Sequence, residues 1–554
     1  MGGEYNRWAV FMNSFWNLCY PHDRSKALLL LLLAGLVYLP FINNPLVFDD
    51  TTFFKSSIAY FADASFDFTF RWFPYTTLGV TWALFGEALP VFRVQNLLLH
   101  GMNVLVLLLV LRLWITLFIA EPVRQQMANG GAWLGALVFA CHPLAVYGVG
   151  YLVQRSILMA TLFTLLMHLA YFRGLIGGSR RYAALAVAAY FFAAFSKEHS
   201  LMAPAILLPL TWILRAQIKL PHRVLLATWV GFVVIALIVV LRAKGLFGQI
   251  YEKDAESLLG QEELLKGLPM LHLLSVLTQA GLFFKYCLLM LIPNPAWTSV
   301  DMRETFILSW RGWQSWVGLL AFIGYGFFAL ICLLRRGRIA LLGLALIYPW
   351  LLFMTEFSAI RVQEIFVLYR TYLWLPGFML LLPLLFGALP DRKILLAGGL
   401  AALLLVPLAW NRLWVFADNY RLWDDAVKLL HGEDRLGAQR IYYNRGYSAA
   451  SKKGDWASAI EDYKKSLQIS SAFPQVKIAL AGAYANAGRY QEALVEYDQA
   501  IAINPKDSEV YYEKALFLKK IRDNAGSMAH MQKSCDLGKG MACAMMSLNR
   551  PKKN

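Results

Sequence analysis

Charged and polar side chains at the ends of long apolar runs are the residues of this chain that could do chemistry. Asp49 and Asp50 come first, in VFDDTTFF, directly after an apolar run. A carboxylate there could accept a proton from an acceptor hydroxyl, or help to bind a divalent cation such as Mg²⁺ or Mn²⁺. Taken alone, the dipeptide is better explained as a solvated helix cap. We predict that one of the two acts as a base, and the sequence does not say which.

A second group is cationic. Arginines and lysines beside a membrane suit the phosphate of a lipid-linked substrate, because charge-assisted hydrogen bonds to phosphate are strong in a low-dielectric site. Each one alone is also explained as an interfacial cation whose stem lies along apolar surface. The expected donor-phosphate residues are Arg155, Lys197, Lys285, Arg361 and Arg370.

A third group could bind the substrates. Arg93, Asn96 and His100 follow one another at spacings of three and four residues, which places them on one face of a helix. The other polar residues lie in CHPLAVYGVGYLVQRS and FSKEHS. The expected substrate-binding residues are Arg93, His100, His142, Gln154, Glu198 and His199.

The elements that carry these residues divide the chain into two regions. Hydrophobic residues make up 58% of the 554 residues and charged residues 16%, whereas soluble proteins carry about 25% charge. The deficit ends near residue 412, so we expect a membrane domain over 1–412 and a soluble domain over 413–554. The net charge of +17 is explained by basic cytoplasmic loops, with no basic run typical of nucleic-acid binding. The first apolar run lacks a signal-peptide cleavage site and should remain in the membrane.

The apolar runs predict an all-α polytopic membrane domain of about eleven spans. We expect spans at 27–43, 91–118, 131–149, 154–172, 182–196, 199–214, 224–241, 314–334, 339–355, 371–388 and 394–410. Four basic clusters become cytoplasmic only if the apolar helix at 270–292 is re-entrant or interfacial. The candidate residues and the C-terminal domain then share the extracytoplasmic face.

A repeat of 34 residues starts near Tyr443. Gly454-Asp455-Trp456 recurs as Gly488-Arg489-Tyr490, and small and aromatic residues recur at Ala459/Ala493 and Tyr463/Tyr497. This pattern is typical of tetratricopeptide (TPR) repeats, which stack helix pairs into an α-solenoid. We expect about three repeats, which bind a peptide or partner or merely rigidify the membrane domain.

The degenerate third repeat contains KSCDLGKGMAC. It resembles the TPR-like repeats of small cysteine-rich secreted proteins, and the resemblance implies a Cys535–Cys543 disulfide in an oxidising compartment. Two free buried thiols are the alternative.

Several segments, in order, resemble the transmembrane and TPR-repeat O-mannosyltransferases and their bacterial relatives, which have the GT-C membrane fold. They are VFDDTTFF, RWFPYTTLGVTWALFG, FRVQNLLLHGMNVL, CHPLAVYGVGYLVQRSILMA, FSKEHSLMAPAILLP, LTQAGLFFKYCLLMLIPNP and VLYRTYLWLPGF. The resemblance covers essentially the whole chain.

The resemblance implies a glycosyltransferase that uses a polyprenyl-phosphate-linked sugar and glycosylates an extracytoplasmic acceptor, usually a Ser or Thr of a protein. We expect a single displacement by the acceptor hydroxyl, which makes the enzyme inverting. The resemblance also implies a bacterial inner-membrane enzyme with its active site and repeats in the periplasm. One position departs from the family, because Tyr147 stands where a glutamate is common. This departure weakens a two-carboxylate metal site and leaves the donor sugar open.

Two other interpretations remain. An oligosaccharide ligase would use a diphosphate-linked glycan, and a non-catalytic TPR scaffold would need neither Asp49, Asp50 nor the cations. A transporter is disfavoured because, apart from His168, the spans carry almost no ionisable residue at mid-depth. The acceptor, the metal dependence and the oligomeric state also stay open.

Overall fold

The computed structural model describes residues 21–63, 69–243, 248–250, 268, 270–471 and 474–548. Over these residues the chain is helical and forms no strand; isolated bridges occur, such as that between Ile250 and Ile360. The expected all-α class is confirmed for this part of the chain. The N-terminal residues 1–20, on which the signal-peptide expectation partly depends, lie outside it.

The chain forms two compact units. The first unit ends at Asp418, and the second contains residues 301–305 and everything described from Asn419 onward. The boundary expected after residue 412 falls inside helix α20 (Asp391–Val415).

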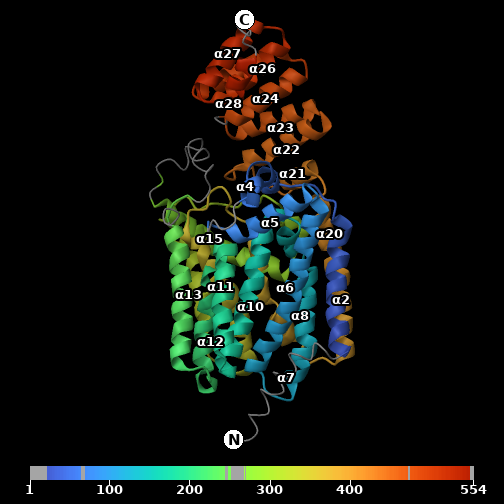
Figure 1. Ribbon diagram of the computed structural model, residues 1–554, viewed down its shortest axis with the longest axis vertical. Helices are drawn as coiled ribbons and strands as arrows, with labels where there is room; N and C mark the ends of the chain where they lie inside the picture. Colours follow the sequence, from blue (N-terminus) through green and yellow to red (C-terminus); the bar gives the residue numbers. More distant parts are fainter. Residues whose placement is uncertain are drawn as a thin grey trace. The chain divides into compact units, whose positions relative to one another are not determined.

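Long apolar helices make up the first unit (Figure 1). Nine segments of the described chain are long and apolar enough to cross a membrane, or up to ten if the pair 123–141 and 143–149, bent by 49°, is one span. Leucine and valine side chains cover the outward face of α13, as expected of a surface that meets lipid. The main helices are α2 (Pro21–Tyr38), α6 (Leu89–Phe118), α8 (Ala132–Cys141), α10 (Arg155–Gly177), α11 (Arg180–Ser196), α13 (His222–Arg242), α15 (Leu271–Leu291), α16 (Gln314–Leu333), α17 (Gly337–Phe353), α18 (Thr371–Phe378), α19 (Leu381–Phe386) and α20.

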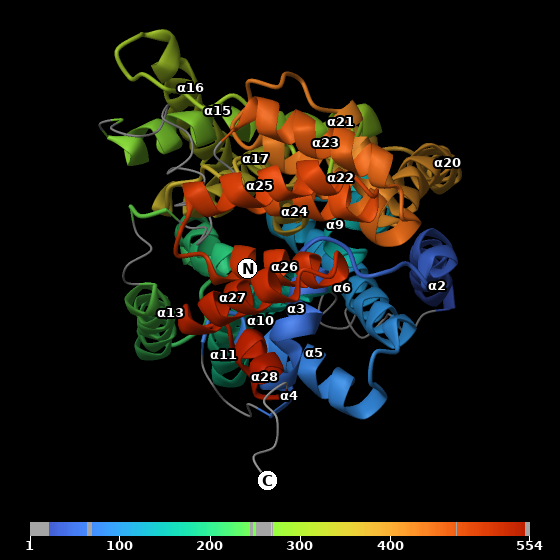
Figure 2. The same cartoon turned by 90° about the horizontal axis from the view of Figure 1, so that it is seen from above.

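The first and last of these candidate spans are neighbours. Helices α2 and α20 lie side by side in both views (Figures 1 and 2). The indole Nε1 of Trp410 donates to the carbonyl of Leu36 at 3.2 Å. The two ends of the membrane unit are therefore packed against each other.

Two expected spans, at 182–196 and 199–214, are not among the nine candidate spans of the described chain. Helix α11 has 17 residues, and the segment expected at 199–214 is a 3-10 helix (Glu198–Ile206) followed by the short helix α12 (Leu207–Ile213). Pro204, inside the 3-10 segment, has no N–H to donate, which explains why a regular α-helix does not form there.

Helix α15 corresponds to the helix expected at 270–292. It has 21 residues and passes the same length and composition criteria as the other candidate spans. However, its side chains bind the segment 357–367, which connects α17 to α18. His272 contacts the carbonyl of Phe357 at 2.7 Å, and Gln279 donates to that of Ile365 at 2.8 Å. That this helix is re-entrant or interfacial remains our prediction.

The second unit is a stack of helices that repeat every 34 residues. Helices α23 (Trp456–Ile469), α25 (Tyr490–Ile503) and α27 (Asn524–Asp536) start one period apart, as do α24 (Pro474–Asn486) and α26 (Ser508–Lys520). Ala459 and Ala493 are fully buried at equivalent helix contacts. The unit is completed by α21 (Asn419–Lys428), α22 (Ala438–Lys453) and α28 (Gly540–Leu548).

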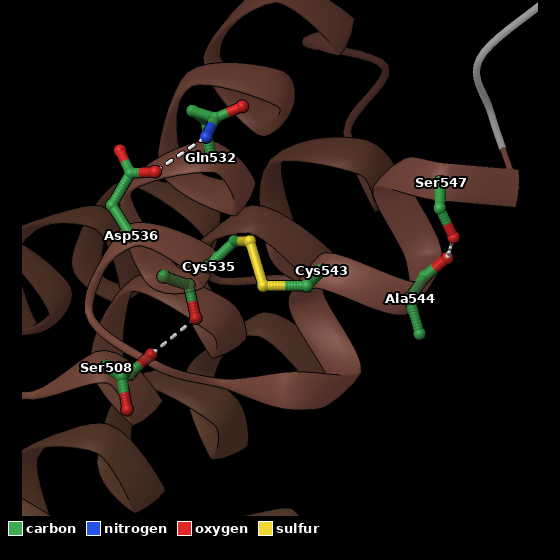
Figure 3. The surroundings of a disulfide bond; sticks show 8 residues. Ser508, Gln532, Cys535, Asp536, Cys543, Ala544 and Ser547 are labelled. Atoms are coloured by element: carbon green, nitrogen blue, oxygen red, sulfur yellow. Dashed lines mark hydrogen bonds between the residues drawn. A yellow bond between two sulfur atoms is a disulfide. The ribbon is translucent and has the colours of Figure 1, made fainter.

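The two cysteines of the third repeat lie on either side of the turn between α27 and α28. Cys535 and Cys543 form a disulfide with a Cα–Cα distance of 4.8 Å (Figure 3). The other described cysteines, Cys141, Cys287 and Cys332, are free and buried.

Candidate functional site

Asp50 is held by backbone amides. Its side chain is fully buried in α3 (Asp49–Ser56), and its two oxygens accept from the N–H groups of Leu152 and Val153 at 3.1 and 2.8 Å. Burial raises the pKa of Asp50 to about 7, although these hydrogen bonds and the charge of Arg93 oppose the shift. Asp50 therefore positions α3 against the start of α10.

Asp49, one residue earlier, is exposed. Its backbone N–H donates to the hydroxyl of Tyr151 at 3.0 Å. The preceding residue, Phe48, has φ = 51°, a conformation that a bulky side chain rarely adopts. Such strain is retained only where surrounding structure enforces it, and it is common beside active sites. Asp49 is thus the exposed carboxylate of the pair.

Arg93 and Arg155 donate their hydrogen bonds to other residues of the protein. Arg93 donates to the carbonyls of Asn44, Pro45 and Gly150 at 2.6–3.0 Å. Arg155 donates to Asn96 Oδ1 at 2.9 Å and to Thr77 Oγ1 and the carbonyl of Phe92, both at 3.3 Å. All three donor nitrogens of each guanidinium are used, so both arginines hold together the segments around Asp50.

His100 and His142 also have internal partners. His100 Nδ1 lies 2.8 Å from the hydroxyl of Tyr372, and its Nε2 lies 3.1 Å from the carbonyl of Ala140. His142 caps a 3-10 turn by accepting from the N–H of Leu144, and its Nε2 contacts the carbonyl of Met290 at 3.2 Å. Both rings are almost completely buried. The structure therefore separates these residues, together with Arg93 and Arg155, from the remaining candidates.

Lys197 is a fully buried cation. Its Nζ donates to Gln154 Oε1 at 3.3 Å and lies 4.7 Å from the centroid of the Tyr369 ring. Within the described chain no carboxylate lies within ion-pair distance of it. Burial lowers the pKa of Lys197 well below its usual range, and the charge of Arg71 lowers it further. An anion bound here would relieve both penalties.

Glu356 is the centre of the second group of candidates. This carboxylate is fully buried, and its oxygens lie 2.5 Å from Arg370 Nη1, 2.9 Å from His199 Nε2 and 3.5 Å from Arg361 Nε. Arg361 and Arg370 are themselves almost fully buried. The carboxylate of Glu356 thus contacts three of the residues that the sequence analysis selected, His199, Arg361 and Arg370.

Glu198 pairs with Arg71. Two parallel contacts join them, at 2.5 and 3.1 Å. Burial alone would raise the pKa of Glu198, but the guanidinium of Arg71 and the neighbouring His199 hold it well below its usual range. Arg71 has φ = 61° at the start of α5 (Trp72–Phe85), which makes it a second strained residue of this region.

A cavity of about 400 Å³ lies against this group. Its polar wall includes Arg71, Glu198, His199 and Arg361. Its apolar wall comes from the end of α13 and from the segments around Met202 and Met354. Asp49 is not part of the lining. The hydroxyl of Tyr151 accepts from the N–H of Asp49, and the ring centroids of Tyr151 and Tyr369 are 6.4 Å apart. Tyr369 is the ring that lies against the Nζ of Lys197.

The other expectations are placed as follows. Lys285 is half-buried on α15, with its Nζ 5.5 Å from the centroid of Phe366. Tyr147 is buried against Phe416. Among the residues described, no three His, Cys, Asp or Glu side chains form a group able to hold a metal ion.

Sequence reasoning missed Arg71, Tyr151, Glu356 and Tyr369. Glu356 carried a signal, because it is the one acidic residue in the apolar run LIYPWLLFMTEF. Arg71 begins RWFPYTT, a segment that contributes to the family resemblance, but the resemblance gives the arginine no role. The two tyrosines had no signal, since their role depends on partners that are distant in sequence.

Comparison with known families matches residues 450–516 to the tetratricopeptide repeat family. The comparison with curated proteins gives no match. The C-terminal unit therefore contains tetratricopeptide repeats, and the first unit is an all-helical assembly with helices suited to a membrane.

Proposed function

We propose that the chain is an inverting membrane glycosyltransferase of the GT-C type. It would transfer a sugar from a polyprenyl phosphate to an extracytoplasmic acceptor, a Ser or Thr hydroxyl of a protein. The observation that supports this most is the cavity, which combines the partly exposed Arg71 and the buried Arg361 with an apolar wall; Lys197 and Arg370 are not part of its lining. A lipid phosphate has that combination of chemistry.

The charge balance around the cavity favours an anionic ligand. Arg71, Lys197, Arg361 and Arg370 are four cations, whereas Glu198 and Glu356 are the two carboxylates that pair with members of this group. The half-exposed Glu364 also acts on Lys197, and the balance stays positive when it is counted. A phosphate would neutralise the excess, while the prenyl chain would lie along Val239 and Val240 of α13.

Asp49 is the base in this proposal, because it is exposed while Asp50 is bound to amides. The acceptor oxygen attacks the anomeric carbon as its proton passes to the Asp49 carboxylate. The bond between that carbon and the phosphate oxygen breaks, and the lipid phosphate leaves with the bonding electrons. Lys197 and Arg71 stabilise the charge that develops on the leaving phosphate. The single displacement inverts the configuration.

The TPR repeats would bind the acceptor protein. Stacked repeats of this kind form concave surfaces that bind peptides. The proposal also places the repeats and Asp49 in the bacterial periplasm, on the outer side of the inner membrane. No step of the proposed reaction uses a divalent cation.

Replacing Lys197 with methionine tests the donor site. Methionine has a similar length and removes the cost of the buried charge, while the Oε1 of Gln154 loses its donor. We expect native mass spectrometry to show that it loses bound polyprenyl phosphate. Lys55→Met, which replaces an exposed lysine on α3, is the control and should retain the lipid. Equal occupancy in a folded Lys197→Met protein would refute the assignment and favour the scaffold alternative. A diphosphate-linked glycan bound instead would indicate the ligase.

A further inference from the structure

His168 is an ionisable residue in the middle of a predicted span, and the proposed function leaves it unused. It is fully buried on α10, thirteen residues after Arg155, which corresponds to about 20 Å along a helix. Its Nδ1 lies 2.8 Å from the carbonyl of Thr164. A carbonyl only accepts, so Nδ1 carries the proton in the neutral ring and Nε2 is a hydrogen-bond acceptor.

Three aromatic rings from three helices meet at this point. The centroid of Trp114 on α6 lies 5.5 Å from that of His168 and 5.6 Å from that of Tyr348 on α17. The centroids of His168 and Tyr348 are 5.8 Å apart. Each side chain is fully buried. The three rings therefore form a closed triangle inside the membrane unit.

In the described part of the chain, each of these rings has a polar atom without a hydrogen-bond partner, and so does Thr164, four residues before His168. Within the described chain, Trp114 Nε1, His168 Nε2, Tyr348 OH and Thr164 Oγ1 are buried and make no hydrogen bond. Thr164 differs here from Thr161, one turn earlier, whose hydroxyl donates to the carbonyl of Ile157 at 2.8 Å. Leaving a buried polar atom unpaired costs about 1–3 kcal/mol. These four atoms belong to side chains of one packed cluster, and a bound ligand would supply the partners that they lack.

We propose that Trp114, Thr164, His168 and Tyr348 form a binding site for water inside the membrane unit. The indole N–H is a donor, the imidazole Nε2 is an acceptor, and the two hydroxyls can be either. Water accepts from the indole and donates to the imidazole, and further hydrogen bonds to the hydroxyls give it the two to four partners that buried water requires. The site is separate from the candidate active site and does not depend on the proposed function.

Radiolytic hydroxyl-radical labelling of the purified protein tests the site, because a short X-ray pulse makes radicals from bound water and marks the side chains beside it. We expect Trp114 and Tyr348 to be modified several-fold faster than Tyr372. Tyr372 is equally buried, but its hydroxyl is already bonded to His100. Equal rates for the three residues in the wild-type protein would overturn the proposal.

Two variants sharpen the result. His168→Phe keeps a ring and removes the acceptor, so labelling of Trp114 and Tyr348 should fall towards that of Tyr372. Met167→Leu, an apolar change at the neighbouring buried position, controls for altered packing and should leave labelling unchanged. If His168→Phe does not fold, Thr164→Val removes one partner at nearly constant shape, and a lower labelling rate is again expected. Unchanged labelling in a folded variant would refute the role of the residue replaced.

Discussion

Replacing Glu356 with glutamine would test whether this carboxylate holds the second group of candidate residues together. Glutamine has the same shape, so the change removes the charge and little else. Arg370 and Arg361 would then face a neutral amide, at contacts that are 2.5 and 3.5 Å in the wild type. Removing one partner of a buried ion pair costs about 3–5 kcal/mol, because the remaining charge stays buried without compensation. We expect a free energy of unfolding lower by that amount.

The measurement is equilibrium or thermal unfolding of the purified protein in detergent. Glu364→Gln is the matched control, since Glu364 is half-exposed and makes no ion pair within the described chain; it should change stability by less than about 0.5 kcal/mol. Arg370→Gln added to Glu356→Gln should cost less than the sum of the single changes, because contacting charges couple by about 0.5–3 kcal/mol. Equal effects of Glu356→Gln and its control, or strict additivity, would refute the central role of Glu356.

Three further predictions concern other parts of the chain. Burial raises the pKa of Asp50 to about 7, so the folded state binds the proton of this carboxyl more tightly than the unfolded state does. The free energy of unfolding should therefore fall as pH rises from about 4 to about 7. Unfolding scans of Asp50→Asn should lack this pH dependence. Arg522 has φ = 68° at the position where the earlier repeats have Gly454 and Gly488. Arg522→Gly should therefore raise the unfolding temperature of the repeats by the equivalent of about 1 kcal/mol. An unchanged or lower unfolding temperature would show that the backbone at Arg522 is not strained. Cys535→Ser should lower the stability of the repeats by about 2–3 kcal/mol under oxidising conditions, because it removes the disulfide. A reducing agent should then lower the stability of the wild type and leave that of the variant unchanged. If the reducing agent lowers the stability of both proteins equally, the disulfide makes no contribution.

Local patterns were enough to predict much of the fold. The 34-residue period was read from small and aromatic residues, and Ala459, Ala493, Tyr463 and Tyr497 are indeed buried at the helix contacts of the repeat. The apolar runs predicted helices suited to a membrane, because lipid requires long stretches without charge. Irregular segments were harder, as the 3-10 helix around Pro204 shows.

The site was predicted only in part, because the partners of its cations are distant in sequence. Arg93 looked like Arg361 in the sequence, yet it binds carbonyls of residues 44, 45 and 150. Arg361 instead shares Glu356 with Arg370. Whether a basic residue supports the fold or faces a cavity depends on such contacts. For the same reason, the exposure of Asp49 and the burial of Asp50 could not be told from two adjacent letters.

The most direct test of the proposed function compares intact masses of extracytoplasmic proteins from cells with the wild-type gene, without it, and with Asp49→Asn. Asp63→Asn, which changes an exposed acid on α4 (Ile58–Asp63), is the matched control. We predict that a protein gains the mass of one sugar with the wild type and the control, and with neither of the other two. The same gain in Asp49→Asn cells would contradict Asp49 as the base, and no gain in any strain that expresses the folded protein would contradict a protein glycosyltransferase.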